Sequence, residues 1–435
     1  MTALERLAAV LGAVDPAPEE RALLRLHVVD TIGAWHAGQR TPEGVALRGL
    51  ETAPVPAMTS GVLDRIAVAC ATVRLTEIDD IHLPSCTTPS SVMVPVALGL
   101  AAALPQPGDI QAAMAAGYRA MLRLGEAIDG ANILYRGIWP TYFTAPFAAA
   151  TITARLLGLD KDKTAHALAI ALTMSTGGSG RTAPVAPRSG VTASRWLLLG
   201  NAVRSGCLAA LAAERGMTAD LTLLDGDWLQ ATHGIKFDRE KLGRIAEPAV
   251  GEISYKPWCS AKQAIAATDA FQRILARGIR PDDISEIIVD VPPPYFPMVS
   301  HRAPPEAGLG ALTSVACRIG LAAYDPKRLD DVARSATPGT RGVTALIGKV
   351  TVQADEKLMQ HYPARYPARV TVATQAGRNS ELVVDAPGDP GTDYGEASVV
   401  AKFRRFAGNQ PMPSLAALDE TAQLKALGRQ MCGLS

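Results

Sequence analysis

The sequence predicts a two-domain protein, with a large all-α helical domain at residues 1–250 and a smaller α+β domain at residues 251–393. At 435 residues the chain exceeds what one hydrophobic core usually organises. Before Gly251 the apolar residues recur at helical spacing, and after it several short segments alternate or become β-branched. Residues 394–435 return to the helical pattern, and we expect them to pack back onto the first domain.

The helical prediction rests on long segments with one apolar face. In Glu19–Ala37 the apolar positions follow a helical stripe, which we expect to end at Gly38. Further helices are expected at Val62–Leu75, Ser91–Ala103, Asp109–Leu124, Ala145–Leu157, Asp162–Met174 and Trp196–Arg215. The last of these is apolar on all sides and carries small residues at about one-turn spacing. A helical domain that also buries a face in a dimer would explain such a helix.

Strands are expected only in the second domain. The segments with the strand pattern are Ile284–Val291, Gly348–Ala354, Ala368–Thr374 and Ser380–Asp385, the last two forming a hairpin. Helices are expected between the first two strands, at Ala307–Ala323 and Arg328–Ser335, and again at Tyr394–Phe406 and Ser414–Leu427. Strands and helices mixed in this way indicate an α+β layer.

Composition excludes several classes of function. The net charge is +1, from 43 basic and 42 acidic side chains, so no broad field attracts nucleic acid or an anionic membrane. Six cysteines lie far apart, with neither a CxxC pair nor histidines at metal-ligand spacing, which favours buried thiols in a reducing compartment and no metal site. The first residues fit no signal peptide, and we expect a cytoplasmic protein.

The densest set of reactive side chains is Thr76–Val92. It holds three carboxylates, one imidazole and a run of hydroxyls, namely Glu77, Asp79, Asp80, His82, Ser85, Thr87, Thr88, Ser90 and Ser91. Acidic, imidazole and hydroxyl groups at a helix boundary suit proton transfer, and a hydroxyl-rich turn entering a helix suits an anion. The alternative is a helix N-cap preceded by a solvated acidic turn.

Three other segments carry candidate groups. Lys256, between Tyr255 and Pro257-Trp258, suits a desolvated acid, base or anion anchor, although most single lysines lie at the surface. The glycine-rich stretch 177–195 carries Arg181, Arg188 and Arg195, which suit carboxylates, although an ordinary loop gives the same pattern. That stretch does not end in the Gly-Lys-Ser/Thr of a nucleotide P-loop.

The remaining segment is aromatic. In YRGIWPTYFTAP, at residues 135–146, Trp139 and Tyr142 suit a pocket wall with the Tyr142 hydroxyl as a proton donor. The alternative is an aromatic cluster in the core.

In order and spacing, these segments resemble the MmgE/PrpD family of 2-methylcitrate dehydratases, cis-aconitate decarboxylases and iminodisuccinate epimerases. The similar stretches are EIDDIHLPSCTTPSS, RGIWPT…APFAAATITARLLGLD, RWLLLGNAVRSGCLAALAAERG, YKPWCSAKQAIAATDAF, HRAPPEAGLGALTSVACRIGLAAYD, KVTVQAD, PARVTVAT and VAKFRRFAG. The resemblance covers nearly the whole chain. It implies an all-helical domain with a smaller α+β lid, a homodimer with the site between the domains, and no metal or organic cofactor.

Several positions depart from the family pattern. Glu77 keeps a carboxylate at the family's first acidic position, and Lys256 keeps its lysine. The other family positions hold Ile81 for a threonine, Thr88 and Trp139 for two histidines, Arg195 for a lysine and Cys317 for a tyrosine. The lost imidazoles are the groups that titrate most readily near neutral pH. The resemblance with these departures therefore predicts a substrate other than the standard tricarboxylates.

The sequence thus predicts a cofactor-independent isomerase or lyase that transfers a proton α to a carboxylate, carbonyl or imine of a small acid. The predicted catalytic residues are Lys256, Tyr142, His82, Glu77 and Asp80; those predicted to bind substrate are Arg195, Thr88, Ser90, Trp139 and Arg181. Two alternatives remain open at this point. One is a hydro-lyase or decarboxylase of the family's usual kind, with His82 replacing the lost imidazoles, and the other is a non-catalytic relative that binds a ligand.

Overall fold

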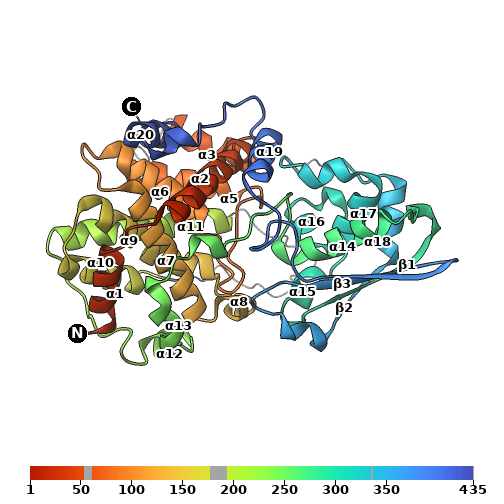
Figure 1. Cartoon of the computed structure of the whole chain (residues 1–435), viewed down its shortest axis with the longest axis horizontal. Helices are drawn as coiled ribbons and strands as arrows, with labels where there is room; N and C mark the ends of the chain where they lie inside the picture. The colour runs from red at the N-terminus through yellow and green to blue at the C-terminus, as the bar shows by residue number, and fades with distance from the viewer. Residues whose placement is uncertain (53–60, 177–193, 335–336, 435) are drawn as a thin grey trace.

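The computed structural model describes residues 1–52, 61–176, 194–334 and 337–434, and it divides into a helical part and a part with one sheet (Figure 1). The helices of the first part are α1 Ala3–Gly12, α2 Pro18–Gly38, α3 Pro42–Thr52, α5 Val62–Arg74, α6 Ser90–Ala103, α7 Ile110–Ala127, α8 Gly130–Ile133, α9 Pro140–Leu157, α10 Lys161–Thr173, α11 Ser194–Glu214, α12 Trp228–His233 and α13 Arg239–Gly243. Their buried faces form one large apolar core.

The second part is built on a four-stranded sheet in the order β2-β1-β3-β4. Its strands are β1 Ile284–Val291, β2 Val350–Ala354, β3 Ala368–Thr374 and β4 Gly377–Val383. Strand β1 runs parallel to β2 and antiparallel to β3, and β3 pairs with β4 as a hairpin. The helices of this part are α14 Ile265–Leu275, α15 Phe296–Val299, α16 Leu309–Thr313, α17 Val315–Tyr324 and α18 Arg341–Lys349. Helices α14, α17 and α18 lie together on one face of the sheet (Figure 1).

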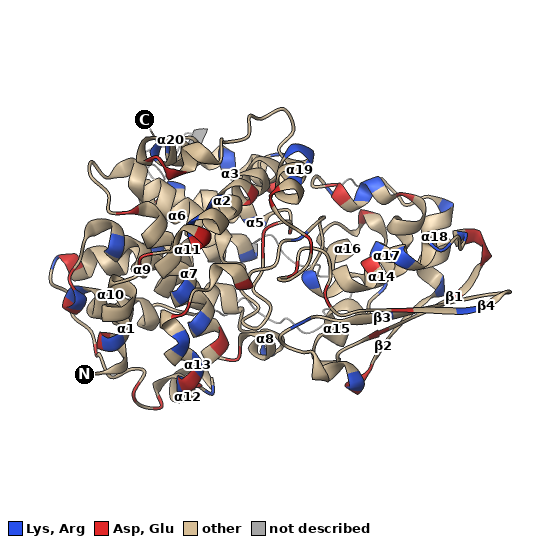
Figure 2. Ribbon diagram, in the orientation of Figure 1, with Lys and Arg blue, Asp and Glu red and all other residues tan. Residues whose placement is uncertain are grey.

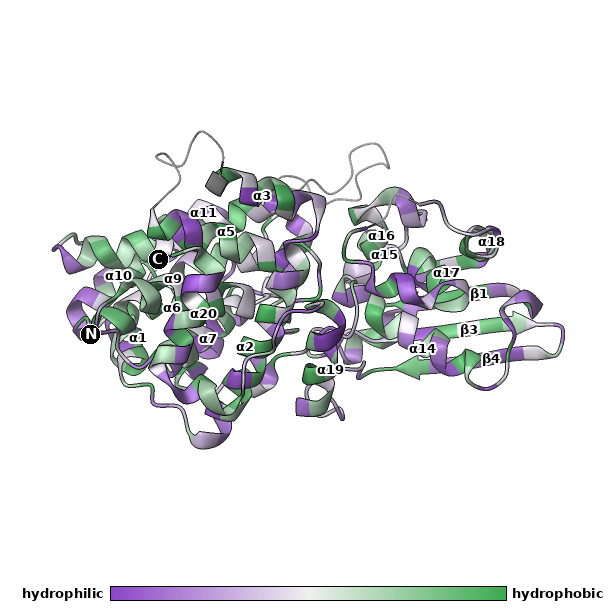
Figure 3. Cartoon of the chain, turned by 90° about the horizontal axis from the view of Figure 1, so that it is seen from above, coloured by the Kyte–Doolittle hydropathy of each residue, from purple (hydrophilic) through white to green (hydrophobic). Residues whose placement is uncertain are grey.

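The chain end returns to the helical part. Helix α19, Glu396–Phe406, packs against α2, and helix α20, Thr421–Cys432, packs against α6. The view from above shows α19 beside the junction of the two parts (Figure 3). Each part also contributes side chains to the core of the other. Ile81 and Leu83, which lie between helices of the first part, pack in the core under the sheet, and Tyr255, which lies after position 250, packs in the helical core. Because segments cross in both directions, the predicted boundary at 250/251 stays a prediction.

Several predicted elements differ in detail. The predicted helix Ala307–Ala323 is divided at Ser314, whose side chain accepts a hydrogen bond from the backbone of Cys317 and caps α17. Instead of the predicted helix Arg328–Ser335, the chain forms the short 3-10 helix Pro326–Asp330 followed by a turn. The sequence prediction missed α18, a nine-residue helix capped by Thr340, although its buried residues Val343, Leu346 and Ile347 recur at helical spacing.

One helix in the described residues, α11, has the length and apolar composition of a membrane span. Half of its apolar stretch is buried inside the protein, and one helix of this kind does not by itself indicate a membrane protein. The small residues predicted to allow close packing do so: a Cβ atom at Gly206 would overlap the backbone of Pro146 in α9. The cytoplasmic location stays a prediction.

Gly388 provides a test of how the chain end holds the segment around Lys256. Its carbonyl accepts a hydrogen bond from the Tyr255 N–H (2.9 Å), its φ is +92°, and an added Cβ would overlap the Tyr255 carbonyl oxygen. We expect Gly388→Ala to lower the free energy of unfolding by about 3 kcal/mol or more. Urea unfolding measures this. Gly391 is the matched control, because its φ is +89° but no atom lies within 4 Å of its added Cβ.

Gly391→Ala should lose only the cost of the left-handed backbone, about 1–2 kcal/mol. Equal losses in the two variants would show that the close approach to Tyr255 contributes nothing.

Candidate functional site

The reactive segment Thr76–Val92 is held by a two-bond bridge to the segment that carries Lys256. The Ile81 N–H donates to the Ser254 carbonyl (2.9 Å) and the Ser254 N–H donates to the Ile81 carbonyl (2.8 Å). A second contact fixes Ser254 from the other side, because its hydroxyl donates to Asp389 (2.8 Å), which also pairs with the buried ammonium of Lys262. Figure 2 shows charged positions on the loops that run between the two parts.

A buried cluster of charges surrounds Glu77. Its carboxylate lies 3.2 Å from the Lys256 Nζ, 2.6 Å from an Arg195 Nη and 3.0 Å from an Arg74 Nη. Arg74 also binds both oxygens of Asp79, at 2.6 and 2.7 Å, and the Lys256 Nζ lies 3.9 Å from Asp79. Arg74 ends α5, Arg195 begins α11, and Glu77 adopts a left-handed backbone with φ of 57° between them.

The pKa values of the two carboxylates in this cluster are shifted in opposite directions. Burial alone would raise the pKa of Glu77, but the charges of Arg74, Lys256 and Arg195 hold that pKa well below its ordinary value. For Asp79, burial raises the pKa, and the nearby Glu77 charge adds to the rise although Arg74 and Lys256 oppose it. Glu77 is therefore the fixed anion, and Asp79 is the carboxylate that takes up a proton more readily.

An aromatic pair forms one wall of the cluster. Trp139, just before α9, stacks on Tyr142 with ring centroids 5.5 Å apart, and the Arg195 guanidinium lies 4.9 Å from the Trp139 ring centroid. The Tyr142 hydroxyl is buried and has no hydrogen-bond partner among the described residues. Burial raises the pKa of Tyr142 to about 12, so its hydroxyl keeps its proton at neutral pH.

The cluster has more donors than acceptors. Three cations, Arg74, Arg195 and Lys256, face the two carboxylates, which leaves a formal charge of +1. Within the described residues the Nε atoms of both arginines are also buried without a partner, as is the Tyr142 hydroxyl. Since unpaired buried donors are costly, this arrangement suits a bound anion.

Asp80 belongs to a different buried network. Its carboxylate accepts hydrogen bonds from the backbone N–H (3.1 Å) and hydroxyl of Ser90 and lies 2.8 Å from His27 Nδ1. The Ser90 hydroxyl is also 2.5 Å from that of Tyr118. Ser90 and Asp80 both approach Nδ1, the same nitrogen of His27, so the three do not form the relay of a Ser-His-Asp triad. The network anchors α6 to α2 and α7.

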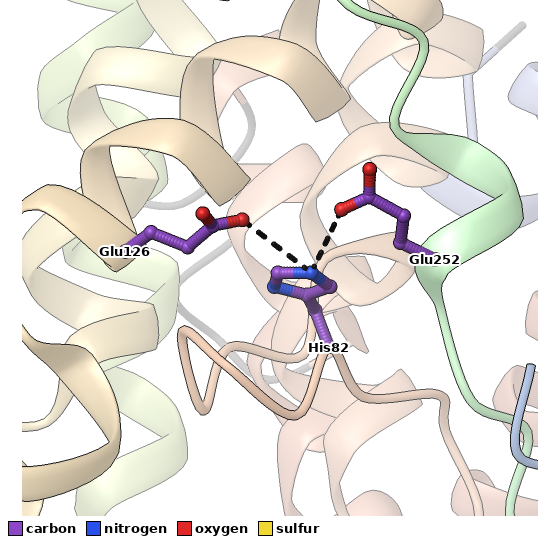
Figure 4. A group of neighbouring side chains, drawn as sticks. All are labelled: His82, Glu126 and Glu252. Carbon is purple, nitrogen blue, oxygen red and sulfur yellow. Dashed lines mark hydrogen bonds and ion pairs between the residues drawn. The ribbon is translucent and has the colours of Figure 1, made fainter. Parts of the chain in front are cut away.

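His82 belongs to a third network. Its Nε2 lies 3.3 Å from Glu252 and 3.7 Å from Glu126 (Figure 4), and its Nδ1 lies 2.8 Å from the Ser85 hydroxyl. Burial would raise the pKa of Glu252, but hydrogen bonds from Arg123 and His82 lower it to about 2.

The same three side chains are the potential metal ligands of this region, with ligand atoms within 4.8 Å of one another. Arg123 contacts Glu126 at 2.6 Å and Glu252 at 2.6 and 2.7 Å, and Arg244 lies 3.2 Å from Glu126. Because the two guanidinium groups already balance the two carboxylates, a divalent cation would have to displace them. The donor set does not fit a metal well, and the absence of a metal from the function stays a prediction.

The structure separates the predicted site residues. It brings together five of them, Lys256, Glu77, Tyr142, Arg195 and Trp139. Thr88 lies beside this group, because its N–H donates to the hydroxyl of Thr141 (3.1 Å), the residue before Tyr142. Asp80, Ser90 and His82 lie in the other two networks. Arg181 and the rest of the 177–190 stretch lie outside the described residues.

Sequence reasoning passed over several members of these networks. Arg74 lies just before the reactive segment, at the buried end of α5, and His27 lies on the buried face of α2. A charged or imidazole group at a buried helical position could have predicted such a network, because a buried polar group needs a hydrogen-bond or ion-pair partner. Arg123, Glu126 and Glu252 gave no such signal, since only the fold brings α7 close to Glu252.

Comparison with known proteins gives two matches to family models. Residues 4–235 match the MmgE/PrpD N-terminal domain, and residues 258–424 match the MmgE/PrpD C-terminal domain. A search of curated proteins found no match. The two matched ranges correspond to the helical part and to the part with the sheet, including α19 and the start of α20.

The stabilising role of Glu77 can be tested by Glu77→Gln. This change leaves three buried cations facing Asp79 alone, so we expect the free energy of unfolding at pH 7 to fall by about 3–5 kcal/mol. Because the native pKa of Glu77 is lowered, its contribution is complete above the ordinary pKa of 4.5 and declines as pH falls below that value. The measurement is urea unfolding at several pH values.

The control is Glu286→Gln, which breaks an exposed ion pair with Arg378 and should change stability by less than about 1 kcal/mol. A Glu77 variant as stable as this control would contradict the proposed balance of charges.

Proposed function

The chain belongs to the MmgE/PrpD family, which includes dehydratases and related lyases and isomerases, and from this premise we propose that the Glu77 cluster transfers a proton next to a carboxylate, carbonyl or imine of a small acid. The observation that carries the proposal is the buried contact of Lys256 with Glu77 and Asp79, beside the unpartnered hydroxyl of Tyr142. A basic group and a protonated acid thus adjoin a place that suits an anion.

Binding of the substrate carboxylate is assigned to Arg195 and Arg74. Both guanidinium groups retain a buried Nε donor without a partner in the described part of the chain, and the cluster as a whole has an excess positive charge. A carboxylate between them would satisfy donors and charge together. When a proton leaves the neighbouring carbon, the same cations stabilise the negative charge that develops on the oxygens.

Lys256 is proposed as the base. As an ammonium ion it must lose a proton before it can accept one, and Asp79 is the adjacent carboxylate whose pKa burial raises. Transfer of that proton to Asp79 leaves a neutral amine that can remove the α-proton. Tyr142, with its pKa of about 12, then holds the proton that is returned to the substrate. No organic cofactor is needed for this sequence.

Elimination of water is the second candidate. The protonated hydroxyl of Tyr142 favours it, because a departing hydroxide needs a proton. In that case Tyr142 would give its proton to the leaving oxygen and Lys256 would keep the one it removed. The imidazole of His82, the group predicted from the sequence for this role, instead contacts Ser85, Glu126 and Glu252. Proton return and elimination of water use the same cluster, and the two reactions differ in the product.

A homodimer forms part of the proposal. Helix α11 exposes Leu197 (53%), Leu208 (42%) and Leu198 (37%), although its opposite face packs on α9 and α5. Exposed large apolar side chains on one helix favour burial against another chain. The helix also begins beside the site, at Arg195, so its packing affects the position of that guanidinium.

The proton-transfer proposal predicts exchange of substrate hydrogen with solvent. In D2O, the protein should introduce deuterium into one member of a panel of citrate-type acids, aconitates, iminodisuccinate and simple α-imino acids, as measured by NMR. Lys256→Ala should reduce the exchange rate about 10²–10⁴-fold. Lys425→Ala is the control, because in the described part of the chain the Lys425 ammonium bonds to the carbonyls of Leu104 and Pro105, just after the end of α6.

Exchange at the wild-type rate in Lys256→Ala would refute the role of this lysine. If no candidate exchanges but one of them raises Tm, the chain is instead a ligand-binding relative. Loss or gain of alkene absorbance distinguishes elimination from epimerisation.

Tyr142 gives a second test, in which activity and stability should separate. Within the described ranges the hydroxyl has no partner to lose, so Tyr142→Phe should leave the free energy of unfolding within about 1 kcal/mol of the wild type. Turnover should fall about 10²–10⁴-fold if the hydroxyl donates the proton. Tyr118→Phe is the matched control, since it removes a buried hydroxyl that is bonded to Ser90, and it should cost about 1–3 kcal/mol.

Unchanged turnover in Tyr142→Phe would contradict the proton-donor role. A loss of stability as large as in Tyr118→Phe would show that the Tyr142 hydroxyl already has a partner in solution.

A further inference from the structure

A cavity of 280 Å³ lies between the two parts of the chain. Its lining residues are Pro42, Glu43, Ala307, Gly308, Leu309, Gly310, Ala333 and Arg334. A narrower gap of 20 Å³ shares Gly308 and Arg334 with it and reaches Arg318, Arg328 and Asp331. The view from above shows α3 and α16, which border this region, on opposite sides of the junction (Figure 3). The cavity is large enough for a small organic acid, and the gap is large enough for a water molecule.

Arg318 is the unusual residue at the end of this gap. It is 3% exposed, and no carboxylate in the described ranges lies within ion-pair distance of its guanidinium. One Nη donates to the Cys259 carbonyl (3.1 Å) and the other lies 3.8 Å from the Cys317 sulfur, while Nε is buried and has no partner among the residues that the structure describes. A buried cation without a counter-charge is costly, because one neutral carbonyl replaces little of its lost hydration.

The surrounding charges favour an anion in the same place. Arg334 lies where the gap meets the cavity and forms an ion pair with Glu43, across the junction of the two parts. Arg328 and Asp331 also line the gap, so the five charged residues that line the two spaces carry a formal charge of +1. In the described ranges no carboxylate forms an ion pair with Arg318, so its guanidinium contributes to this excess charge.

We propose that Arg318 and Arg334 form a second anion site, which takes the carboxylate or phosphate group of a small organic acid held in the cavity. The fork of a guanidinium matches the two oxygens of either group, and the unpartnered Nε supplies a donor for it. This site goes beyond the proposed function and does not depend on it. It is distinct from the Glu77 cluster, although Arg334 lies 5.9 Å from the ring centroid of Trp196, the residue after Arg195.

The test is Arg318→Met, which replaces the buried cation by an apolar side chain of similar length. In dilute sodium chloride without other anions, the Tm of the variant should equal or exceed that of the wild type, because an uncompensated buried charge is removed. Succinate or inorganic phosphate, added at constant ionic strength, should raise the Tm of the wild type by a few degrees and leave that of Arg318→Met unchanged. The two anions distinguish a carboxylate ligand from a phosphate ligand.

Arg302→Met is the matched control, since Arg302 also donates to a backbone carbonyl, that of Val350, but does not line either space. It should lose some stability and keep the full response to the anion. Arg318→Lys retains the charge without the fork and should keep a reduced response, which allows the test to proceed if Arg318→Met does not fold.

Two results would overturn the proposal. One is an Arg318→Met variant whose Tm rises with the anion as much as that of the wild type. The other is a wild-type Tm that rises with neither anion, together with an Arg318→Met variant whose Tm is lower than that of the wild type. Arg318 would then act only by its hydrogen bond to the Cys259 carbonyl.

Discussion

The two backbone hydrogen bonds between Ile81 and Ser254 are the constraint on which the site depends. They join segments 173 positions apart in the chain and set them antiparallel. Because side chains alternate along extended backbone, neighbouring residues must diverge. Asp79 meets Lys256, whereas Asp80 meets His27, which in turn stacks on Tyr255 at 4.7 Å. The segment Thr76–Val92 therefore supplies residues to three separate networks. A shift of one residue in the pairing of Ile81 with Ser254 would place different side chains in each network.

The Glu77 cluster is a costly arrangement that the surrounding structure maintains. Each of its ions has lost most of its hydration, and pairing within the protein repays this only when the geometry is good. Glu77 is satisfied by three cations and stays ionised, while Asp79 is buried more deeply and has a raised pKa. Two neighbouring carboxylates with pKa values driven apart are typical of sites that assign one group to charge and the other to proton transfer.

The sequence allowed much of the fold to be predicted and less of the site. Helix α19, which buries Val399, Phe403 and Phe406, and the alternating strand β3, which buries Ala368, Val370 and Val372, follow directly from hydrophobic periodicity. The resemblance to the family drew attention to Glu77, Lys256 and Arg195, which are far apart in the chain, and the structure places them in contact. Arg74 and Arg318 were missed, because the partners of a buried arginine depend on tertiary contacts that no local pattern records.

Under the proposed function, the charge balance gives a physical reason for substrate binding to activate Lys256. In the free protein the Lys256 ammonium is stabilised by Glu77 and Asp79, and an ammonium ion is no base. A substrate bound at the Glu77 cluster would exclude water and lower the local dielectric, which disfavours two separated charges relative to a neutral amine and a neutral acid. Transfer of a proton from Lys256 to Asp79 then becomes easier at the moment when the amine is needed. The substrate carboxylate meanwhile neutralises the excess charge of Arg74 and Arg195, so that those cations no longer oppose protonation of Asp79. The base would thus form only in the presence of the acid on which it acts.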